Sequence, residues 1–300
     1  MPKTKNIIIL SEKSSGSSAC QNLLAKFADA RHIGKTRHFE NETLYWTKAA
    51  SILGKPQIKM VDSEVPLEAG KARDELITLL RDNLGDYVPP QDDTELIFQG
   101  WQSLCQQYSP IFIEKSPHHL CQWSALELIV DHIREAKDVD FLIIGLIRNP
   151  MDTIYSQWKR WKSPPQKVEE QWRIAYRNLI RLQGVGGISL MIVRYEDIVS
   201  SLGHMDRAFE FCGVRPTADD EGYLHGKSLS KWKSDRLFGH TLSDETIELA
   251  KQYGYRRDEI QNVPHPFWNI ISGVSRMIHP ATISVKGIAR RLCPRKPGKG

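Results

Sequence analysis

Residues 7–20 read IIILSEKSSGSSAC, an apolar run that leads directly into a turn rich in serine and glycine. Residues 141–150 read FLIIGLIRNP, a second apolar run that ends on Arg148. Short apolar runs bounded by turn residues are typical of strands that are buried on both faces. A Ser/Gly turn at the start of a helix offers backbone N–H groups and hydroxyls to an anion. Together the two segments predict a ligand with two separated phosphate-like groups.

The chain repeats this strand-then-helix unit four times. The strands are expected at 6–11, 110–115, 141–147 and 188–194, and the helices after them at about 17–30, at about 119–136, from Asn149 onward, and at about 198–212. Repeated β-α units predict an α/β fold, a parallel β-sheet flanked by helices on both faces. Right-handed crossovers place the loops after the strands at one edge of the sheet, where ligands of such folds bind. We therefore expect residues 14–18, Lys115, Arg148 and 195–196 to lie along that edge.

The 300 residues are enough for a single large α/β domain, which we place at 1–265. A mostly helical insertion is expected from about 36 to 107, with helices near 41–53 and 67–80. The remaining residues, 266–300, are predicted to form an amphipathic helix followed by a basic tail. The apolar pattern within 268–293 predicts a packing helix, with contact to a membrane surface as the alternative. Residues 289–300 carry five basic residues and no acidic one, as a solvated tail would.

Composition indicates a soluble globular protein with 40% hydrophobic and 26% charged residues. The formal net charge of +5 favours anionic ligands but is too small to predict a nucleic-acid partner. The cysteines are odd in number and show no CxxC spacing, so neither a disulfide framework nor a zinc site is expected, and no other metal site is predicted. No apolar stretch is long enough for a transmembrane segment or a signal peptide. A cytoplasmic location is expected.

The segment after the third strand carries a second anion-binding pattern. Asn149 is a favoured helix cap and Pro150 a favoured first residue, so a helix is predicted to begin here. Ser156 lies almost two helical turns past the cap and returns to the same face. Arg148 and Ser156 are thus placed to hold one anion from two sides.

These motifs resemble those of sulfotransferases that use 3′-phosphoadenosine-5′-phosphosulfate (PAPS). Ser15, Gly16, Ser17 and Ser18 match the family's 5′-phosphate turn, and Arg148, Pro150 and Ser156 match its 3′-phosphate pattern. The resemblance implies a P-loop nucleotide-binding-like fold, PAPS as the donor, PAP as the product, and no metal. The family usually has a basic residue before its Ser-Gly pair. This chain has Ser14 there, and Lys13 one residue earlier, which leaves open whether Lys13 contacts the sulfuryl group.

Two further segments resemble the same family. Residues 114–117, Glu-Lys-Ser-Pro, match an element whose lysine lies near the transferred group, which makes Lys115 a candidate catalytic residue. A fixed cation there stabilises charge on the departing oxygen. Residues 227–233 resemble the loop that closes over the 3′-phosphate, with Ser230, Trp232 and Lys233 as candidate ligands. Residues 193–197 match a segment to which we assign structural support.

The catalytic base is expected shortly after the first helix, where the family keeps it. His38 and Glu42 lie four residues apart and would share one face of a helix, so that one orients the other. Glu42 resembles the family's acidic position most closely. His118 and His119, beside Lys115, are the next candidates.

The function that these patterns predict is transfer of a sulfuryl group from PAPS to a hydroxyl or amine. The acceptor is expected to be a carbohydrate or another small or polymeric molecule. One alternative is a nucleotide-dependent phosphoryl transferase (a kinase) on a similar sheet, although the GxxxxGK[ST] pattern of ATP-binding P-loops is missing. Another is a non-catalytic binder of nucleotides or anionic glycans.

Overall fold

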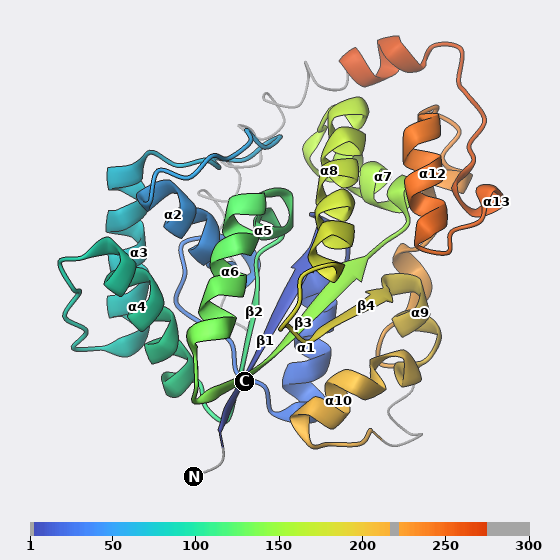
Figure 1. Cartoon of the computed structure of the whole chain (residues 1–300). Helices are drawn as coiled ribbons and strands as arrows, with labels where there is room; N and C mark the ends of the chain where they lie inside the picture. The colour runs from blue at the N-terminus through green and yellow to red at the C-terminus, as the bar shows by residue number, and fades with distance from the viewer. Residues whose placement is uncertain (1–2, 217–221, 275–300) are drawn as a thin grey trace, which may run out of the picture.

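A computed structural model describes residues 3–216 and 222–274 of the chain, and Figure 1 shows a central sheet with helices on both sides. The described residues form a four-stranded parallel sheet of order β2-β1-β3-β4. The strands are β1 (Thr4–Ser11), β2 (Ile111–Lys115), β3 (Val139–Ile147) and β4 (Leu190–Arg194). The predicted α/β fold with a parallel sheet is confirmed.

The strand order fixes where a ligand can bind. From β1 the chain crosses to β2 on one side, whereas from β3 it crosses to β4 on the other side. The crevice between β1 and β3 is therefore the topological switch point, the usual ligand site of open α/β sheets. The register places Ser11 beside Leu146 and Ile147 beside Arg194, so the strands end along one edge.

Alternate side chains of the central strands enter two separate cores, as expected for a sheet covered on both faces. Ile8, Leu10 and Ile143 belong to the larger core, and Ile7 and Ile9 to the smaller one. The helices that contribute to the smaller core include α1 (Ser17–Ala28), α9 (Tyr195–Ser200) and α10 (Asp206–Cys212). The larger core includes residues of α2 (Tyr45–Ile52), α3 (Ala69–Leu84), α4 (Asp93–Gln107), α6 (Trp123–Glu135), α7 (Pro150–Trp161), α8 (Pro165–Gln183) and α12 (Asp244–Gln252).

Three of the predicted helices begin late or are divided in the structure. The helix expected from residue 41 begins only at Tyr45, because Asn41 and Leu44 have left-handed backbone angles (φ 60° and 52°). The helix expected over 119–136 is divided at Gln122, which is extended, into α5 (His118–Cys121) and α6. The helix expected over 198–212 is divided at Ser201, also extended, into α9, the 3₁₀ turn η2 (Leu202–Met205) and α10. Hydrophobic periodicity does not detect such breaks, because the apolar positions continue across them.

The shorter elements join these helices. They are η1 (Phe39–Asn41), η4 (Gly226–Ser228), α11 (Lys231–Ser234) and α13 (Arg257–Ile260). Residues 268–274 are helical, with Trp268 buried in the larger core and Ile270 exposed. The rest of the predicted amphipathic helix and the basic tail lie outside the described residues. Within the described part of the chain, no helix has the length and apolar character needed to cross a bilayer.

A buried carboxylate joins α8 to the start of α12. Glu169 is 5% exposed and accepts hydrogen bonds from the Ser243 hydroxyl (2.7 Å) and the Thr246 hydroxyl (2.6 Å), while His240 Nε2 lies 2.9 Å away. Burial alone would raise the pKa of Glu169, but the bonds from His240, Thr246 and Ser243 outweigh it and lower the pKa to about 2.

This carboxylate should make stability depend on pH. Because its folded pKa of about 2 lies below the ordinary 4.5, its contribution is complete above pH 4.5 and is lost as pH falls toward 2. Replacing a charged buried acceptor typically costs about 2–3 kcal/mol. We expect Glu169→Gln to lower the Tm at neutral pH, with the deficit shrinking below pH 4.5. Thermal unfolding followed by circular dichroism across this pH range measures the effect.

The matched control is Glu170→Gln, the same change at the exposed neighbour on α8. A deficit for Glu169→Gln that is the same at acidic and neutral pH would contradict the assignment.

Candidate functional site

The turn after β1 is shaped by a close contact with Tyr195. Gly16, the residue before α1, has φ +93°, and a Cβ there would lie 2.3 Å from Cδ2 of the Tyr195 ring. Ser14 also has a left-handed backbone (φ 63°), and the Ser15 amide donates to the Glu12 carbonyl (3.3 Å). Only glycine fits against the ring at this conformation. Tyr195 therefore supports the turn by packing against it.

Arg148 follows β3 and ties the two predicted anion-binding segments together. Its side chain donates from Nη1 to the Ser14 carbonyl (2.9 Å) and from Nη2 to the Ser228 carbonyl (2.8 Å). The guanidinium also lies over the Tyr195 ring, 5.2 Å from its centroid. Arg148 is 6% exposed, and its buried Nε has no hydrogen-bond partner among the described residues. The Ser/Gly turn and Arg148 thus meet at the switch point, and one buried N–H of the guanidinium has no partner among the described residues.

The predicted closing loop lies against the same arginine. The Ser230 amide donates to the buried Asp152 carboxylate on α7 (2.8 Å), whose pKa burial raises to about 6 against the charge of Arg148. Lys233 is exposed, whereas Trp232 is 2% exposed within the larger core. Ser156 is half-buried on α7, two turns from the cap, as predicted from its spacing.

A second group of side chains gathers around Lys115, whose side chain is fully buried. Its Nζ lies 3.3 Å from Glu42 Oε1 and 3.8 Å from Glu40 Oε2. His118, at the start of α5, places Nδ1 3.7 Å from Glu42 Oε2. We call Glu40, Glu42, Lys115 and His118 the Lys115 cluster.

Glu40 joins the Lys115 cluster to residues 14–18, the turn after β1, which we call the first turn. Glu40 was not identified as a site residue from the sequence. The Ser18 hydroxyl donates to Glu40 Oε2 (2.5 Å), and Arg160 of α7 lies 3.5 Å from Glu40 Oε1. In a helix, Glu40 would point away from residues 38 and 42. Its left-handed backbone (φ 54°) breaks the helical geometry, and no periodicity in the sequence signals that change.

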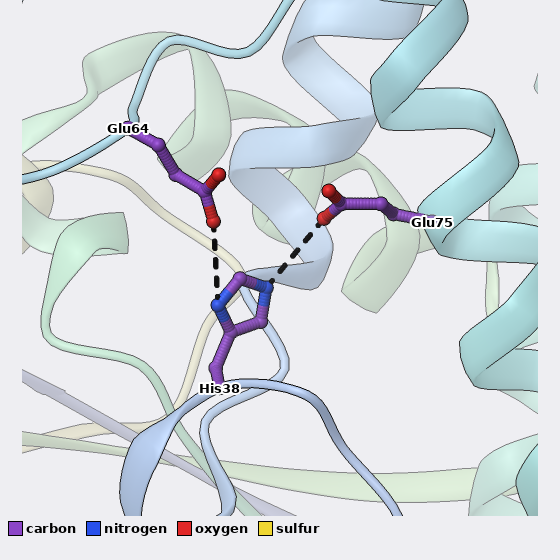
Figure 2. Close-up of side chains that lie close together, drawn as sticks. All are labelled: His38, Glu64 and Glu75. Atoms are coloured by element: carbon purple, nitrogen blue, oxygen red, sulfur yellow. Dashed lines mark ion pairs between the residues drawn. The ribbon is translucent and has the colours of Figure 1, made fainter. Parts of the chain in front are cut away.

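His38 does not belong to the Lys115 cluster, and the predicted shared helix face of His38 and Glu42 is wrong. Its ring lies between Glu64 (Nδ1 to Oε1, 3.5 Å) and Glu75 (Nε2 to Oε2, 3.6 Å), as Figure 2 shows. Burial, and then the charge of Lys48, lower the pKa of His38 to about 4. The ring is thus neutral at physiological pH.

A buried hydrogen-bond network underlies the Lys115 cluster. Glu114 Oε1 accepts from the hydroxyls of Thr43 (2.6 Å) and Ser116 (2.5 Å). The Ser116 hydroxyl in turn accepts from the amides of Thr43 (3.1 Å) and Leu44 (3.0 Å). The end of β2 and the chain that carries Glu42 are therefore fixed to each other. These hydrogen bonds limit how far Glu42 can move from Lys115.

The pKa values of the two carboxylates that face Lys115 are shifted in opposite directions. Burial raises the pKa of Glu42, and this effect outweighs the opposing charge of Lys115. The pKa of Glu40 is lowered, because the Ser18 hydrogen bond and the charges of Lys115 and Arg160 together exceed the effect of its partial burial. A carboxylate with a raised pKa is a stronger base, and an ionised one stabilises positive charge. The cluster therefore offers a base and a cation side by side.

The side chain of Lys13 is bound by a different segment, residues 61–62. Its Nζ donates to the carbonyls of Val61 (2.7 Å) and Asp62 (3.2 Å). Its charge, after burial, also helps to hold the pKa of His118 well below the ordinary range, which indicates that Lys13 lies near the Lys115 cluster. Beside it, Glu12 is fully buried, and burial raises the pKa of its carboxyl group against the charge of Lys13.

Comparison with known proteins identifies relatives of this fold. A family profile described as "Sulfotransferase family" matches residues 6–219. The structure is similar to a sulfotransferase domain from the curacin biosynthetic pathway, at 16% identity and a TM-score of 0.53, covering 85% of this chain and 99% of that one. It is also similar to a sulfotransferase domain from the Synechococcus PCC 7002 olefin synthase, at 20% identity and a TM-score of 0.54, covering 85% and 96% of the two chains. No curated protein matches the sequence.

The contact between Gly16 and Tyr195 leads to a prediction about stability. Gly16→Ala should lower the free energy of unfolding by about 3 kcal/mol or more, because it adds a steric overlap to the cost of a left-handed alanine. Gly54→Ala is the matched control, since Gly54 also has a positive φ (+62°) but nothing within 4 Å of its added Cβ. It should lose only about 1–2 kcal/mol. Urea unfolding measures both, and equal losses would show that the ring contact imposes no constraint.

Proposed function

Because the chain belongs to the sulfotransferase family, we propose that it transfers a sulfuryl group from PAPS to a hydroxyl or amine. We further propose that the acceptor is a carbohydrate or another small or polymeric molecule. The observation that carries the proposal is the meeting of the Ser/Gly turn with Arg148 at the switch point of the sheet. A donor with two phosphate-bearing positions needs two anion sites at a fixed separation, and we assign them to these two segments.

The proposed roles at the donor site follow from the geometry. Residues 14–18 surround the 5′ side through the N-terminus of α1. Arg148, whose buried Nε has no partner among the described residues, takes the 3′-phosphate together with Ser156 on the following helix. Ser230 and Lys233 lie on the segment that Arg148 and Asp152 hold, and we assign them the role of covering the nucleotide. Trp232 supports that segment from within the core.

The proposed chemistry takes place at the Lys115 cluster. Bound PAPS supplies an activated sulfuryl group. Glu42 takes the proton from the acceptor, for which its raised pKa suits it. Lys115 stabilises the negative charge that develops as the nucleotide departs. Glu40 bridges Ser18 and Lys115, which places the base, the cation and the first turn in one network.

Lys13 is the proposed substitute for the basic residue that the family has at the position of Ser14. Its amine is bound to two neutral carbonyl oxygens rather than to a carboxylate, so exchange for a sulfuryl oxygen breaks no ion pair. The exchange replaces hydrogen bonds from the ammonium group to neutral carbonyl oxygens by contacts with an anionic oxygen, in which both partners are charged.

Nucleotide binding tests the donor assignment. PAP at a hundredfold excess over its Kd should stabilise the fold by about 2.7 kcal/mol and so raise the Tm by several degrees. Arg148→Ala should reduce the shift given by PAP more than that given by adenosine 5′-phosphosulfate, which lacks the 3′-phosphate. Differential scanning fluorimetry with ATP as the comparison ligand reads both effects. Stabilisation by ATP and not by PAP would favour the kinase alternative.

Replacing the proposed base tests the chemistry. Glu42→Gln should lower kcat by about 10²- to 10⁴-fold while PAP affinity stays nearly unchanged. Sulfuryl transfer from labelled PAPS across a panel of hydroxyl and amine acceptors gives the rates, and calorimetry gives the affinity. Glu40→Gln, which faces the same lysine but has the lowered pKa, is the matched control and should lose less. If Glu42→Gln turns over normally and His118→Ala is inactive, the base is His118.

A further inference from the structure

The chain segment that carries Glu40 and Glu42 has an unusual backbone. Within five residues, Glu40, Asn41 and Leu44 all adopt left-handed angles (φ 54°, 60° and 52°). For residues other than glycine this conformation costs about 1–2 kcal/mol each. Such strain persists only where surrounding contacts impose the conformation. The contacts that hold this segment are therefore part of the site.

Glu75 of α3 lies where these contacts converge. It is 5% exposed and faces three side chains from or next to the segment: Arg37 Nη1 at 2.8 Å, Lys48 Nζ at 3.5 Å and His38 Nε2 at 3.6 Å. Lys48 in turn donates to the Thr43 carbonyl (2.9 Å). One buried carboxylate is thus linked to the chain on both sides of Glu40 and Glu42.

The same cluster has the donor set of a metal site, but its charges oppose one. Ligand atoms of His38, Glu64 and Glu75 lie within 4.8 Å of one another (Figure 2). However, Arg37 and Lys48 already face Glu75, and Lys71 lies 2.9 Å from Glu64 and 3.8 Å from Glu75. A divalent cation would meet three positive side chains at short range. The charges favour an anchor of ion pairs instead.

We propose that Glu75 is a positioning residue: through Arg37 and Lys48 it holds residues 36–44 in the conformation that places Glu40 and Glu42 beside Lys115. The catalytic consequence rests on the proposed function, whereas the structural link can be tested without it. Glu75 itself touches neither Lys115 nor the first turn in the described contacts. Its effect on turnover therefore acts entirely through the segment.

Glu75→Gln is the test, because it removes the charge and keeps the shape. Asp74→Asn, an exposed neighbour on α3, is the matched control. We expect amide hydrogen exchange in residues 36–44 to speed up about tenfold or more in Glu75→Gln and to stay unchanged in Asp74→Asn. The kcat for sulfuryl transfer should fall about 10- to 100-fold, with the PAP Kd and the donor KM within about twofold of wild type.

Arg37 provides a second variant, in which no buried side chain is replaced, since the Arg37 side chain is 62% exposed. Arg37→Ala should speed exchange in the same residues by a smaller factor, and Arg37→Lys should restore it. Unchanged exchange in both Glu75→Gln and Arg37→Ala would overturn the proposal. So would faster exchange with normal kcat.

The alternative hypothesis, that His38, Glu64 and Glu75 bind a metal ion, is tested separately with Mn²⁺ and Zn²⁺. A metal-dependent rise in Tm that His38→Ala abolishes would overturn the anchor and assign the cluster to a metal. A wild-type protein that transfers no sulfuryl group to any acceptor refutes the proposed function alone, because the exchange result still decides the structural link.

Discussion

A buried guanidinium has to find acceptors, and in this protein that requirement joins distant parts of the chain. Arg148 leaves the centre of the sheet at the end of β3 and is almost fully enclosed. Removing its charge from water is costly unless its N–H groups are bonded. Its two bonds go to main-chain carbonyls, of Ser14 and of Ser228, which lie far apart in the sequence. The position of the first turn and that of the closing loop are therefore set by the same side chain.

The second half of the site depends on a comparable requirement. Lys115 is fully buried, and the carboxylates of Glu40 and Glu42 offset its charge. Those carboxylates come from an insertion, not from a strand end, so the sheet alone cannot place them. The hydrogen bonds of Thr43 and Leu44 to Ser116 hold one end of that segment against β2. Rigid placement of a base next to a cation is what in-line group transfer requires.

Much of the fold could be predicted from the sequence, because the apolar runs of a parallel sheet are continuous and end in recognisable turns. Arg148 and Ser156 were found by their spacing, which a regular helix preserves. Lys115 could be predicted because residues 114–117 resemble a family element at the end of a strand. Glu40 and the surroundings of His38 could not be predicted, since both depend on left-handed backbone angles at residues with no glycine to signal them. A buried ion-pair partner such as Glu75 also leaves no local pattern, because its contacts come from elsewhere in the chain.

The central position of β1 has a consequence for biosynthesis. β1 is made first, yet its neighbours β2 and β3 begin only at Ile111 and Val139. At ribosomal rates the roughly 100 residues between β1 and β2 take about 5–20 s to add. During that interval α1 is available to cover Ile7 and Ile9, but the opposite face, with Ile8 and Leu10, has no partner. The nascent chain thus exposes one apolar face of its first strand until the insertion has emerged.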